Sequence, residues 1–568
     1  MTNKERYNVT IHTSGDGFEI NLANGKVNVP DTNGCYVIST GCGAGKTESI
    51  KSLIRQKANS GIVYCVDTIS ELQKMYQWIK DNLCSIGVLS ENDVVCISSD
   101  LKNCQELKKY KDNPSNLTTK KVILLTHIRF WTDLINYFVV YNPTSPQEPP
   151  FDCDFQKLMA RNDLRKYIIF DETPLFIEPF VTIPKCFLAV FGKQDKKGEW
   201  HCIGRKEMDN RYDKFIKNSP QDLFKDSSEL SKIKRKVALD MIYKNYDCYM
   251  KKASPKCIDI TFKPIMLCQP TTNSHILIYE GVGDVLFQGS KSYQTIDIKT
   301  PKYDGKMFFH QITKKKRRYE SYSDKDKKDV ADIITKQIDS LYGKTLVVVW
   351  QTVGENARDK GDINTSAFVE DLKKRINASN YYDITYFGSN LTKSTNQFRD
   401  FDNIILWGAW HIIKQDTIKF RDCYGTLTDN TEHLMWYYIQ LLCRIGIRNH
   451  NLNNKVYRVY YTDDYDANLI KRLDDYFKNL YQSKTTKQIM EMKLKNKGIR
   501  KSAFKNIIQL ADNNAKIKNA IMNDKPYSLS MTLKQLYNKV PIGKTMKKDN
   551  YKSFIENLNK LGITFKYK

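Results

Sequence analysis

The stretch Thr40-Gly41-Cys42-Gly43-Ala44-Gly45-Lys46-Thr47 follows an apolar run (35–38, CYVI) and precedes an amphipathic segment (50–56). Glycines at this spacing let a chain curl so tightly that several backbone N–H groups converge on one anion. The start of a helix adds its positive dipole to the same point. The order strand, glycine-rich loop, helix therefore predicts a loop that holds the phosphate chain of a nucleotide.

Each residue of this loop has an expected part in the phosphate site. Lys46 would neutralise the β- and γ-phosphates, and the Thr47 hydroxyl would bind Mg²⁺. One position departs from the Gly-x4-Gly-Lys-Thr pattern, because Thr40 stands where the first glycine belongs. The alternative is a plain turn between a strand and a helix. The other residues expected to line the site are Gly41, Gly43, Ala44, Gly45 and Glu48.

The composition of the chain indicates a globular protein with several domains. Its 568 residues, 41% hydrophobic, suit roughly three or four domains with buried cores. No apolar run is long enough to cross a bilayer, and the first ten residues lack an apolar signal region. We therefore expect a soluble, cytoplasmic protein without a membrane partner. The fourteen cysteines show no spacing typical of zinc ligands, which favours free thiols.

Positive charge is concentrated at the end of the chain. The formal net charge is +26, and residues 468–568 carry 23 Lys and Arg against 7 Asp and Glu, a surplus of +16. Such a segment predicts a polyanionic partner. Charge alone leaves nucleic acid and anionic membrane surfaces both open.

The hydrophobic pattern predicts an α/β protein with two parallel-sheet units. Short apolar runs alternate with helical stretches from residue 35 to about 170 and again in the second half of the chain, as expected for parallel strands with crossover helices. The expected units are a β-rich segment (1–34), a first α/β unit (35–311) with a helical insertion (about 175–272), a basic linker (312–328), a second α/β unit (329–466), and a basic, mainly helical, winged-helix-like C-terminal module (467–568).

Two acidic residues follow an apolar strand in the first unit. Asp171 and Glu172 come directly after the run 166–170, KYIIF. Carboxylates at the end of a buried strand are costly unless they have a chemical role there. We expect Asp171 to hold Mg²⁺ through its water shell and Glu172 to deprotonate an attacking water.

A third element follows the insertion. The apolar run 275–279 leads into Glu280-Gly281-Val282-Gly283-Asp284. This strand is expected beside the phosphate loop, where small residues let Asp284 sense the γ-phosphate. An ordinary turn is the alternative.

Two arginines four residues apart, Arg444 and Arg448, lie in the stretch 440–448, QLLCRIGIR. This spacing places both side chains on one face of a helix. A surface ion pair would explain them, but a second α/β unit can also supply arginines that stabilise charge on a transferring phosphoryl group. We therefore expect Gln440, Arg444 and Arg448 to complete the catalytic site.

Taken in order, these motifs resemble those of the superfamily 2 helicases, the DEAD/DEAH-like translocases with two RecA-like lobes, in a form often seen in phages and mobile elements. The resemblance covers about residues 35–465. It rests on GCGAGKT (41–47, motif I), DETP (171–174, the DExx box), YEGVGD (279–284, motif III), TLVVVWQ (345–351, motif IV), STNQF (394–398, motif V) and QLLCRIGIR (440–448, motif VI).

Motifs V and VI depart from the family pattern. Ser394 and Cys443 each stand where the family has glycine, and motif VI has one extra residue between its arginines. Whether Arg444 or Arg448 is the arginine finger therefore stays open.

The resemblance implies ATP and Mg²⁺ as cofactors and a nucleic acid as partner, with DNA favoured over RNA. It implies a role in replication, recombination or processing of DNA, together with partner proteins of those processes, in a bacterial or phage-infected cell. Hydroxyl and basic groups at strand ends suit contacts to the nucleic-acid backbone. The residues implied for these contacts are Thr68, Thr126, Arg129, Thr395 and Asn396.

Two other functions compete with this interpretation. A packaging ATPase of the terminase type would need a nuclease domain with acidic metal ligands, for which 463–466 (DDYD) is the one candidate cluster. A non-enzymatic nucleic-acid scaffold would have a degenerate nucleotide site. The complete set of Lys46, Thr47, Asp171 and Glu172 argues against a scaffold, and the Gln-Arg-Arg pattern of motif VI argues against packaging.

Overall fold

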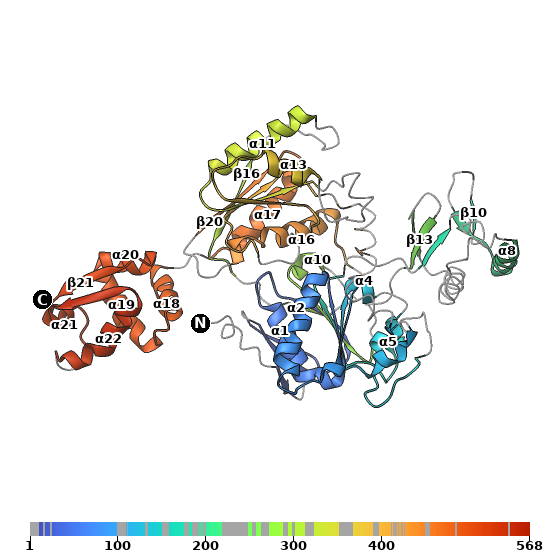
Figure 1. The fold of residues 1–568 in the computed structure, drawn as a ribbon, viewed down its shortest axis with the longest axis horizontal. Coiled ribbons are helices and arrows are strands. Elements are labelled where there is room, and N and C mark those ends of the chain that lie inside the picture. The colour runs from blue at the N-terminus through green and yellow to red at the C-terminus, as the bar shows by residue number, and fades with distance from the viewer. Residues whose placement is uncertain are drawn as a thin grey trace.

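The fold of the chain comes from a computed structural model, shown in Figure 1. The described residues are 11–14, 17–22, 25–98, 109–110, 112–130, 134–149, 158–174, 181–184, 192–194, 196, 200–218, 248–252, 257–262, 272–287, 294–297, 302–312, 323–350, 367–389, 397–410, 412, 417, 420–421, 424, 426–448, 455–482, 485–542 and 546–567.

The first α/β unit contains a seven-stranded sheet with the order β15-β4-β14-β8-β5-β7-β6, in which every pair is parallel. The apolar runs of the sequence form its central strands. Because all strands are parallel, their carboxyl ends meet at one edge, where ligands bind in sheets of this kind. The strands are β4 (Gly34–Ser39), β5 (Ile62–Val66), β6 (Val94–Ile97), β7 (Val122–Thr126), β8 (Tyr167–Asp171), β14 (His275–Glu280) and β15 (Gln294–Asp297).

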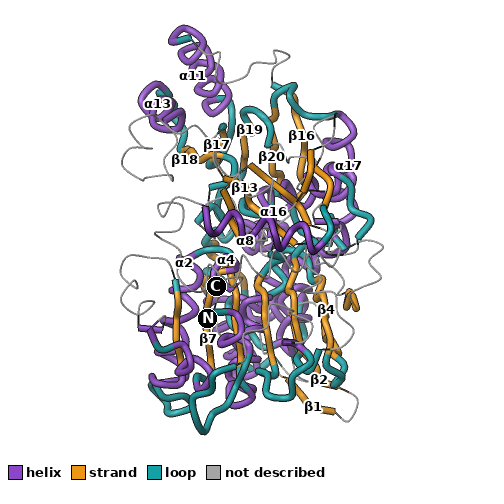
Figure 2. The backbone as a smooth tube through the Cα atoms, turned by 90° about the vertical axis from the view of Figure 1, so that its right-hand side faces the viewer, coloured by secondary structure: helices purple, strands orange, loops and turns teal. Residues whose placement is uncertain are grey.

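The second unit contains a five-stranded parallel sheet with the order β16-β20-β19-β17-β18. It lies above the first sheet in Figure 1, and Figure 2 shows the two sheets one above the other from the side. The predicted α/β class with two parallel sheets is thus confirmed. The strands are β16 (Lys306–Gln311), β17 (Thr345–Val349), β18 (Tyr382–Tyr386), β19 (Asn403–Leu406) and β20 (Val456–Tyr461).

One boundary of the second unit differs from the expectation. We expected the first unit to run to residue 311, yet β16 is an edge strand of the second sheet. The basic segment 312–328 therefore does not connect the two sheets, and α11 already begins at Asp324. The alternation in KMFFHQ is too short to show which sheet the strand joins.

Helices cover both sheets according to their apolar stripes. On the outer face of the first sheet, α1 (Lys46–Lys57) and α2 (Ile69–Ile79) share one apolar core with the strands. On the far face of the second sheet, α11 (Asp324–Asp339) and α13 (Ala367–Arg375) do the same.

Between the sheets, one continuous core includes strands of both units and the helices that face them. These helices are α4 (His127–Phe130), α5 (Ile135–Val139), α10 (Gly283–Leu286), α16 (Asn430–Leu442) and α17 (Ala467–Leu480). No helix in the described ranges is long and apolar enough to cross a membrane.

The N-terminal segment, which we expected to be β-rich, forms an antiparallel sheet. Its strands are β1 (Ile11–Ser14), β2 (Gly17–Leu22) and β3 (Gly25–Val29). Phe18 and Ile20 are buried in the core that α1 and α2 share with the first sheet. This small sheet therefore covers part of the first unit.

The insertion between β8 and β14 contains more strand than predicted. Among its described residues only α8 (Arg205–Asn218) fits the helical expectation. Strands β13 and β9 pair although they are far apart in sequence, a pairing that local periodicity cannot show. The insertion lies beside the lobes in Figure 1 and in front of them in Figure 2. Its strands are β9 (Val181–Pro184), β10 (Gly192–Gln194), β11 (Trp200–Cys202), β12 (Cys248–Lys252) and β13 (Cys257–Phe262).

The C-terminal module has its own apolar core, formed by residues from 490 to 563. It begins with α18, whereas α17, which we expected to open the module, buries Leu473 and Phe477 in the core between the sheets. The other predicted domain boundaries stay predictions. The module's elements are α18 (Thr486–Asn496), α19 (Lys501–Asp512), α20 (Ala515–Asn523), β21 (Tyr527–Met531), α21 (Leu533–Lys539), α22 (Lys548–Lys560) and β22 (Ile563–Tyr567).

The strands of the C-terminal module contradict the winged-helix prediction. A wing is an antiparallel hairpin, but β21 and β22 are parallel neighbours, connected through α21 and α22. Two helices, α21 and α22, and the terminal strand β22 are present. The partner of the terminal strand, β21, lies ahead of these helices in the sequence, which reverses the geometry.

Candidate active site

The glycine-rich loop connects β4 to α1, and its backbone explains both its glycines and its one departure from the usual pattern. Gly41, Gly43 and Gly45 have φ angles of 74°, 84° and 91°, a region that favours glycine. Glu172 and Asp524 are the only described non-glycine residues with positive φ, so Thr40 needs no glycine. Its N–H instead donates to the carbonyl of Glu280 at 3.0 Å.

The start of α1 offers backbone donors to an anion. Its first four N–H groups have no acceptor inside the helix, and Gly45, the N-cap, supplies no side-chain cap. Thr47 is exposed beside this end of the helix. Glu48 is also exposed, and its Oε1 pairs with Lys51 Nζ at 2.8 Å. The side chain of Glu48 is therefore paired with the next turn of α1.

The two carboxylates that follow β8 are fixed in different ways. Asp171 Oδ2 accepts a hydrogen bond from the Tyr64 hydroxyl at 3.0 Å. Glu172 has a φ of 73°, a strained conformation for a residue with a side chain, and its N–H donates to the carbonyl of Tyr279 at 2.9 Å. Strained residues of this kind cluster at functional sites.

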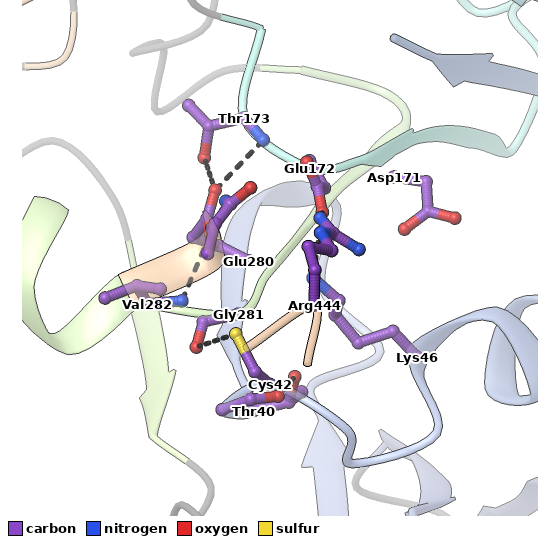
Figure 3. Close-up of polar contacts among 12 residues, drawn as sticks. Thr40, Cys42, Lys46, Asp171, Glu172, Thr173, Glu280, Gly281, Val282 and Arg444 are labelled. Carbon is purple, nitrogen blue, oxygen red and sulfur yellow. Dashed lines mark hydrogen bonds and ion pairs between the residues drawn. The ribbon is translucent and has the colours of Figure 1, made fainter. Parts of the chain in front are cut away.

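Glu172 lies between two cationic groups from different units. Its Oε1 is 3.8 Å from Lys46 Nζ in the loop and 3.6 Å from an Arg444 guanidinium nitrogen of the second unit. Figure 3 shows the three side chains converging. The predicted loop lysine, the predicted base and one of the two predicted arginines are therefore brought together.

Burial and charge tune the acid–base groups of this cluster. Burial raises the pKa of Glu172 to about 7, against the opposing effect of Lys46 and Arg444. Burial alone would lower the pKa of Lys46, but Glu172 and neighbouring carboxylates outweigh it and raise that pKa. A carboxylate with a pKa near neutral is suited to accept a proton from a reacting water.

A buried carboxylate that the sequence analysis did not select connects the two units. Glu280, at the end of β14, accepts hydrogen bonds at Oε2 from the Thr173 N–H at 3.1 Å and the Thr173 hydroxyl at 2.6 Å. Its Oε1 accepts from the Val282 N–H at 3.1 Å and from Gln440 Nε2 at 3.2 Å. Figure 3 shows Glu280 between Thr173 and Val282.

Glu280 could have been found in the sequence, because it ends an apolar strand just as Asp171 does. We selected Asp284 instead, which lies exposed in the first turn of α10. The strand itself was placed correctly, since β14 pairs directly with β4, the strand that leads into the loop.

The predicted geometry of the arginine pair is wrong. Helix α16 ends at Leu442 with Cys443 as its C-cap, and Arg448 ends a separate 3₁₀ turn, so the two arginines share no helix face. Both nevertheless reach the site. A Cβ placed on Gly43 would lie 3.4 Å from Arg448 Cβ, so Arg448 covers the loop while Arg444 meets Glu172.

Further hydrogen bonds hold the two units together around the site. The Tyr424 hydroxyl donates to the carbonyl of Pro174 at 2.6 Å, and the Thr428 hydroxyl donates to that of Leu286 at 2.6 Å. The Tyr303 hydroxyl donates to the carbonyl of Cys42 in the loop at 3.3 Å. The cluster therefore lies in an interface that is closed in this structure.

The residues predicted to contact nucleic acid lie at the carboxyl edge of the first sheet where the structure describes them. Thr68 caps α2 by accepting the Glu71 N–H at 3.3 Å, and Thr126 accepts the Arg129 N–H at 3.3 Å. Their strands, β5 and β7, are neighbours. Thr395 and Asn396 lie outside the described residues. These binding roles stay predictions.

The acidic cluster 463–466 has local structural roles. Asp464 accepts a hydrogen bond from the Thr462 hydroxyl at 2.7 Å, and Asp466 caps α17 through the Asn468 N–H at 2.6 Å. Among the described residues, no group of three or more His, Cys, Asp or Glu side chains is arranged to hold a metal ion.

No known family profile matches the chain, and no curated protein does. Similar solved structures include apo XPD, with a TM-score of 0.40 and 14% identity over 79% of this chain and 95% of that one. Mss116p bound to ssRNA and AMP-PNP has a TM-score of 0.35 and 9% identity over 95% and 89% of the two chains. The DUF1998 helicase MrfA bound to DNA and AMPPNP has a TM-score of 0.32 and 10% identity over 84% and 53%.

Proposed function

We propose that this chain is an ATP-dependent helicase or translocase that acts on nucleic acid, with DNA undergoing replication, recombination or processing as its substrate. The observation that carries the proposal is the position of Arg444, whose guanidinium lies 3.6 Å from Glu172 across the interface between the units. A site assembled from both units is complete only when they are closed. Nucleotide binding and hydrolysis can therefore drive closing and opening.

The residues present fit ATP and Mg²⁺. Lys46 and the free N–H groups at the start of α1 would bind the phosphates. Thr47 and Asp171 offer the oxygen ligands that Mg²⁺ prefers, and Tyr64 holds the Asp171 carboxylate in place at 3.0 Å. The metal would supply positive charge to the β- and γ-phosphates.

In the proposed reaction, this chain's own groups position and activate a water. Glu172 accepts the proton of the attacking water, and Arg444 stabilises negative charge on the phosphoryl group. The Gln440–Glu280–Thr173 hydrogen bonds connect the second unit to the residue directly after Glu172. Loss of the γ-phosphate beside Glu172 can therefore change the hydrogen bonds that hold the two units together.

Two surfaces of the chain support a nucleic-acid partner. At the carboxyl edge of the first sheet, Arg129 is partly exposed and its donors suit phosphate oxygens, whereas Thr68 and Thr126 are buried in this closed structure. The part of the chain that holds the separately folded C-terminal module, residues 483–568, carries 20 Lys and Arg against 5 Asp and Glu. A net charge of this size favours a polyanion.

The proposal is tested by ATPase assays with poly(dT), duplex DNA, poly(U) and no nucleic acid. We expect ATP hydrolysis that nucleic acid stimulates, more strongly with DNA than with RNA. ATP hydrolysis that none of the three polymers changes would contradict a nucleic-acid motor. Larger stimulation by poly(U) than by either DNA would assign the substrate to RNA instead.

Removal of the C-terminal module is expected to weaken nucleic-acid binding without abolishing basal ATP hydrolysis. A chain ending at Gln482 keeps α17 and every proposed catalytic residue. Each lost phosphate contact should lower the log–log slope of affinity against salt by about 0.9 on duplex DNA and about 0.7 on single strands. The measurement is affinity at several salt concentrations for full-length and shortened protein.

Two controls separate charge from folding in this experiment. A chain ending at Asp466 loses Leu473 and Phe477 from the core between the sheets, so it should unfold at lower temperature than the chain ending at Gln482. A full-length Lys505→Gln, Lys552→Gln variant changes two exposed lysines and keeps the fold. An unchanged salt slope in the chain ending at Gln482 would mean that the two α/β units, and not the C-terminal module, make the phosphate contacts.

A further inference from the structure

Two thiols from the two units meet beside the candidate active site. Cys42 lies in the phosphate loop and is 8% exposed, and Cys443 caps α16 and is 1% exposed. The Cys42 thiol donates to the carbonyl of Gly281 at 4.0 Å. The Tyr303 hydroxyl contacts both residues, at 3.3 Å from the Cys42 carbonyl and 3.5 Å from Cys443 Sγ. Tyr303 therefore bridges the two cysteine residues.

The two thiols differ in chemical character. The hydrogen bond from Cys443, together with Lys46, Arg448 and Arg444, lowers the pKa of Cys42 to about 7 although burial opposes this. Burial raises the pKa of Cys443. The thiolate is the nucleophilic form of cysteine. Cys42 is thus suited to attack an oxidant, and Cys443 to resolve the product.

We propose that Cys42 and Cys443 are an oxidisable pair, and that a hydroperoxide converts them into a disulfide. This disulfide joins the phosphate loop to the end of α16, directly before Arg444. In the first step the Cys42 thiolate attacks the O–O bond of hydrogen peroxide, which gives a sulfenic acid and releases hydroxide. In the second step Cys443 sulfur displaces the sulfenic oxygen as water. The hydroxide takes up the proton that the Cys42 thiol lost on ionising, so the two thiols lose two electrons and the peroxide becomes two waters.

The disulfide would hold the two units at a fixed separation. Cys42 lies four residues before Lys46, and Cys443 directly precedes Arg444. A covalent bond between them prevents the opening that exchange of nucleotide needs. Oxidation therefore switches off turnover, a consequence that rests on the proposed function. Formation of the disulfide itself does not depend on it.

The pair differs from two other thiols of the first unit, Cys65 and Cys84. Burial alone raises the pKa of Cys65 in β5, which makes that thiol unreactive. Cys84 is partly exposed, and burial raises its pKa as well. Cys84 therefore serves as a matched control, since it is the more accessible thiol and the groups that shift its pKa are burial, Glu91, Lys80 and Asp93, with no thiol among them.

The test treats the reduced full-length protein with graded hydrogen peroxide, blocks the remaining thiols with N-ethylmaleimide and analyses the digest by mass spectrometry. We expect a Cys42–Cys443 cross-linked peptide that dithiothreitol removes, together with loss and recovery of ATP hydrolysis. Cys84→Ser should give the same cross-link. Cys443→Ser should give none, should label at Cys42 with dimedone, and should recover a larger share of its own untreated rate.

Absence of the cross-linked peptide at peroxide concentrations that oxidise Cys84 would overturn the proposal. Equal yields of the peptide in native protein and in urea would also overturn it, because the native contact would then be irrelevant. If Cys443→Ser fails to fold, alkylation of the wild type by iodoacetamide replaces it. Cys42 should then react with a midpoint near pH 7, and a midpoint no lower than that of Cys84 would count against the pair. A cross-link without any ATP hydrolysis would uphold the pair and reject the proposed function alone.

Discussion

Glu172→Gln should bind ATP with nearly normal affinity and hydrolyse it at a rate lower by about 10²- to 10⁴-fold, the usual contribution of a general base. Glutamine keeps the size of the side chain but cannot accept the proton of the attacking water. The positive φ at this position, 73°, strains glutamine as much as glutamate, so the stability of the fold should change little. Titration with a fluorescent ATP analogue and a steady-state ATPase assay measure the two quantities.

Lys46→Ala provides the contrast. It removes a positive charge from the phosphates, so ATP binding itself should weaken. Glu91→Gln is a matched control, because its side chain is 76% exposed and pairs with Lys80 at 3.9 Å, away from the candidate active site. Normal turnover by Glu172→Gln would show that another group is the base. Equal loss of ATP affinity in Glu172→Gln and Lys46→Ala would instead make Glu172 a structural partner of the lysine.

Arg444→Ala is expected to lower the turnover number by at least about 10²-fold with little change in ATP affinity, since an arginine finger acts mainly on charge that develops in the transition state. Arg444 meets Glu172 directly, whereas Arg448 covers Gly43. We therefore expect Arg448→Ala to affect ATP affinity as well as turnover. Separate measurement of kcat and KM for both variants assigns the finger.

Arg472→Ala serves as the matched control for Arg444. Arg472 also lies in the second unit, but its guanidinium pairs with Glu432 at 3.4 Å on the surface of α17. Exposed pairs of this kind contribute about 0–1 kcal/mol to stability. Turnover in Arg472→Ala should match the wild type. Wild-type rates in both Arg444→Ala and Arg448→Ala would mean that the second unit does not complete the site.

The central strands and the strand-end carboxylates could be predicted because short apolar runs and adjacent acidic residues are local signals. Asp171 and Glu172 follow directly from such a run. Glu280 carries the same signal, but the neighbouring glycines drew attention to Asp284. The bonds that distinguish them, to Thr173 and Gln440, connect residues more than a hundred positions apart. No pattern in a single sequence shows such partners.

Where the sequence analysis was wrong, the local pattern was compatible with packing against either of two neighbouring parts of the protein. The apolar stripe of α17 predicts a helix, yet Leu473 and Phe477 could equally have faced the basic module that follows. The sequence could predict that the two arginines reach the site. It could not predict that they lie on separate turns, because the end of α16 depends on packing at Cys443 and Gly446. A Cβ on Gly446 would lie 2.8 Å from the Tyr457 ring. A side chain at this position would therefore clash with Tyr457.

The strand order of the first sheet also determines when the candidate active site can form during synthesis. Strand β4, which leads into the phosphate loop, pairs only with β14 and β15 among the described strands. A nascent chain must therefore extend to Asp297 before both edges of β4 are covered, and β8 lacks its neighbour β14 until Glu280 has left the ribosome. Pairings over such distances fold late and leave strand edges open to other chains. The glycine-rich loop of this polypeptide is thus translated early and assembled late.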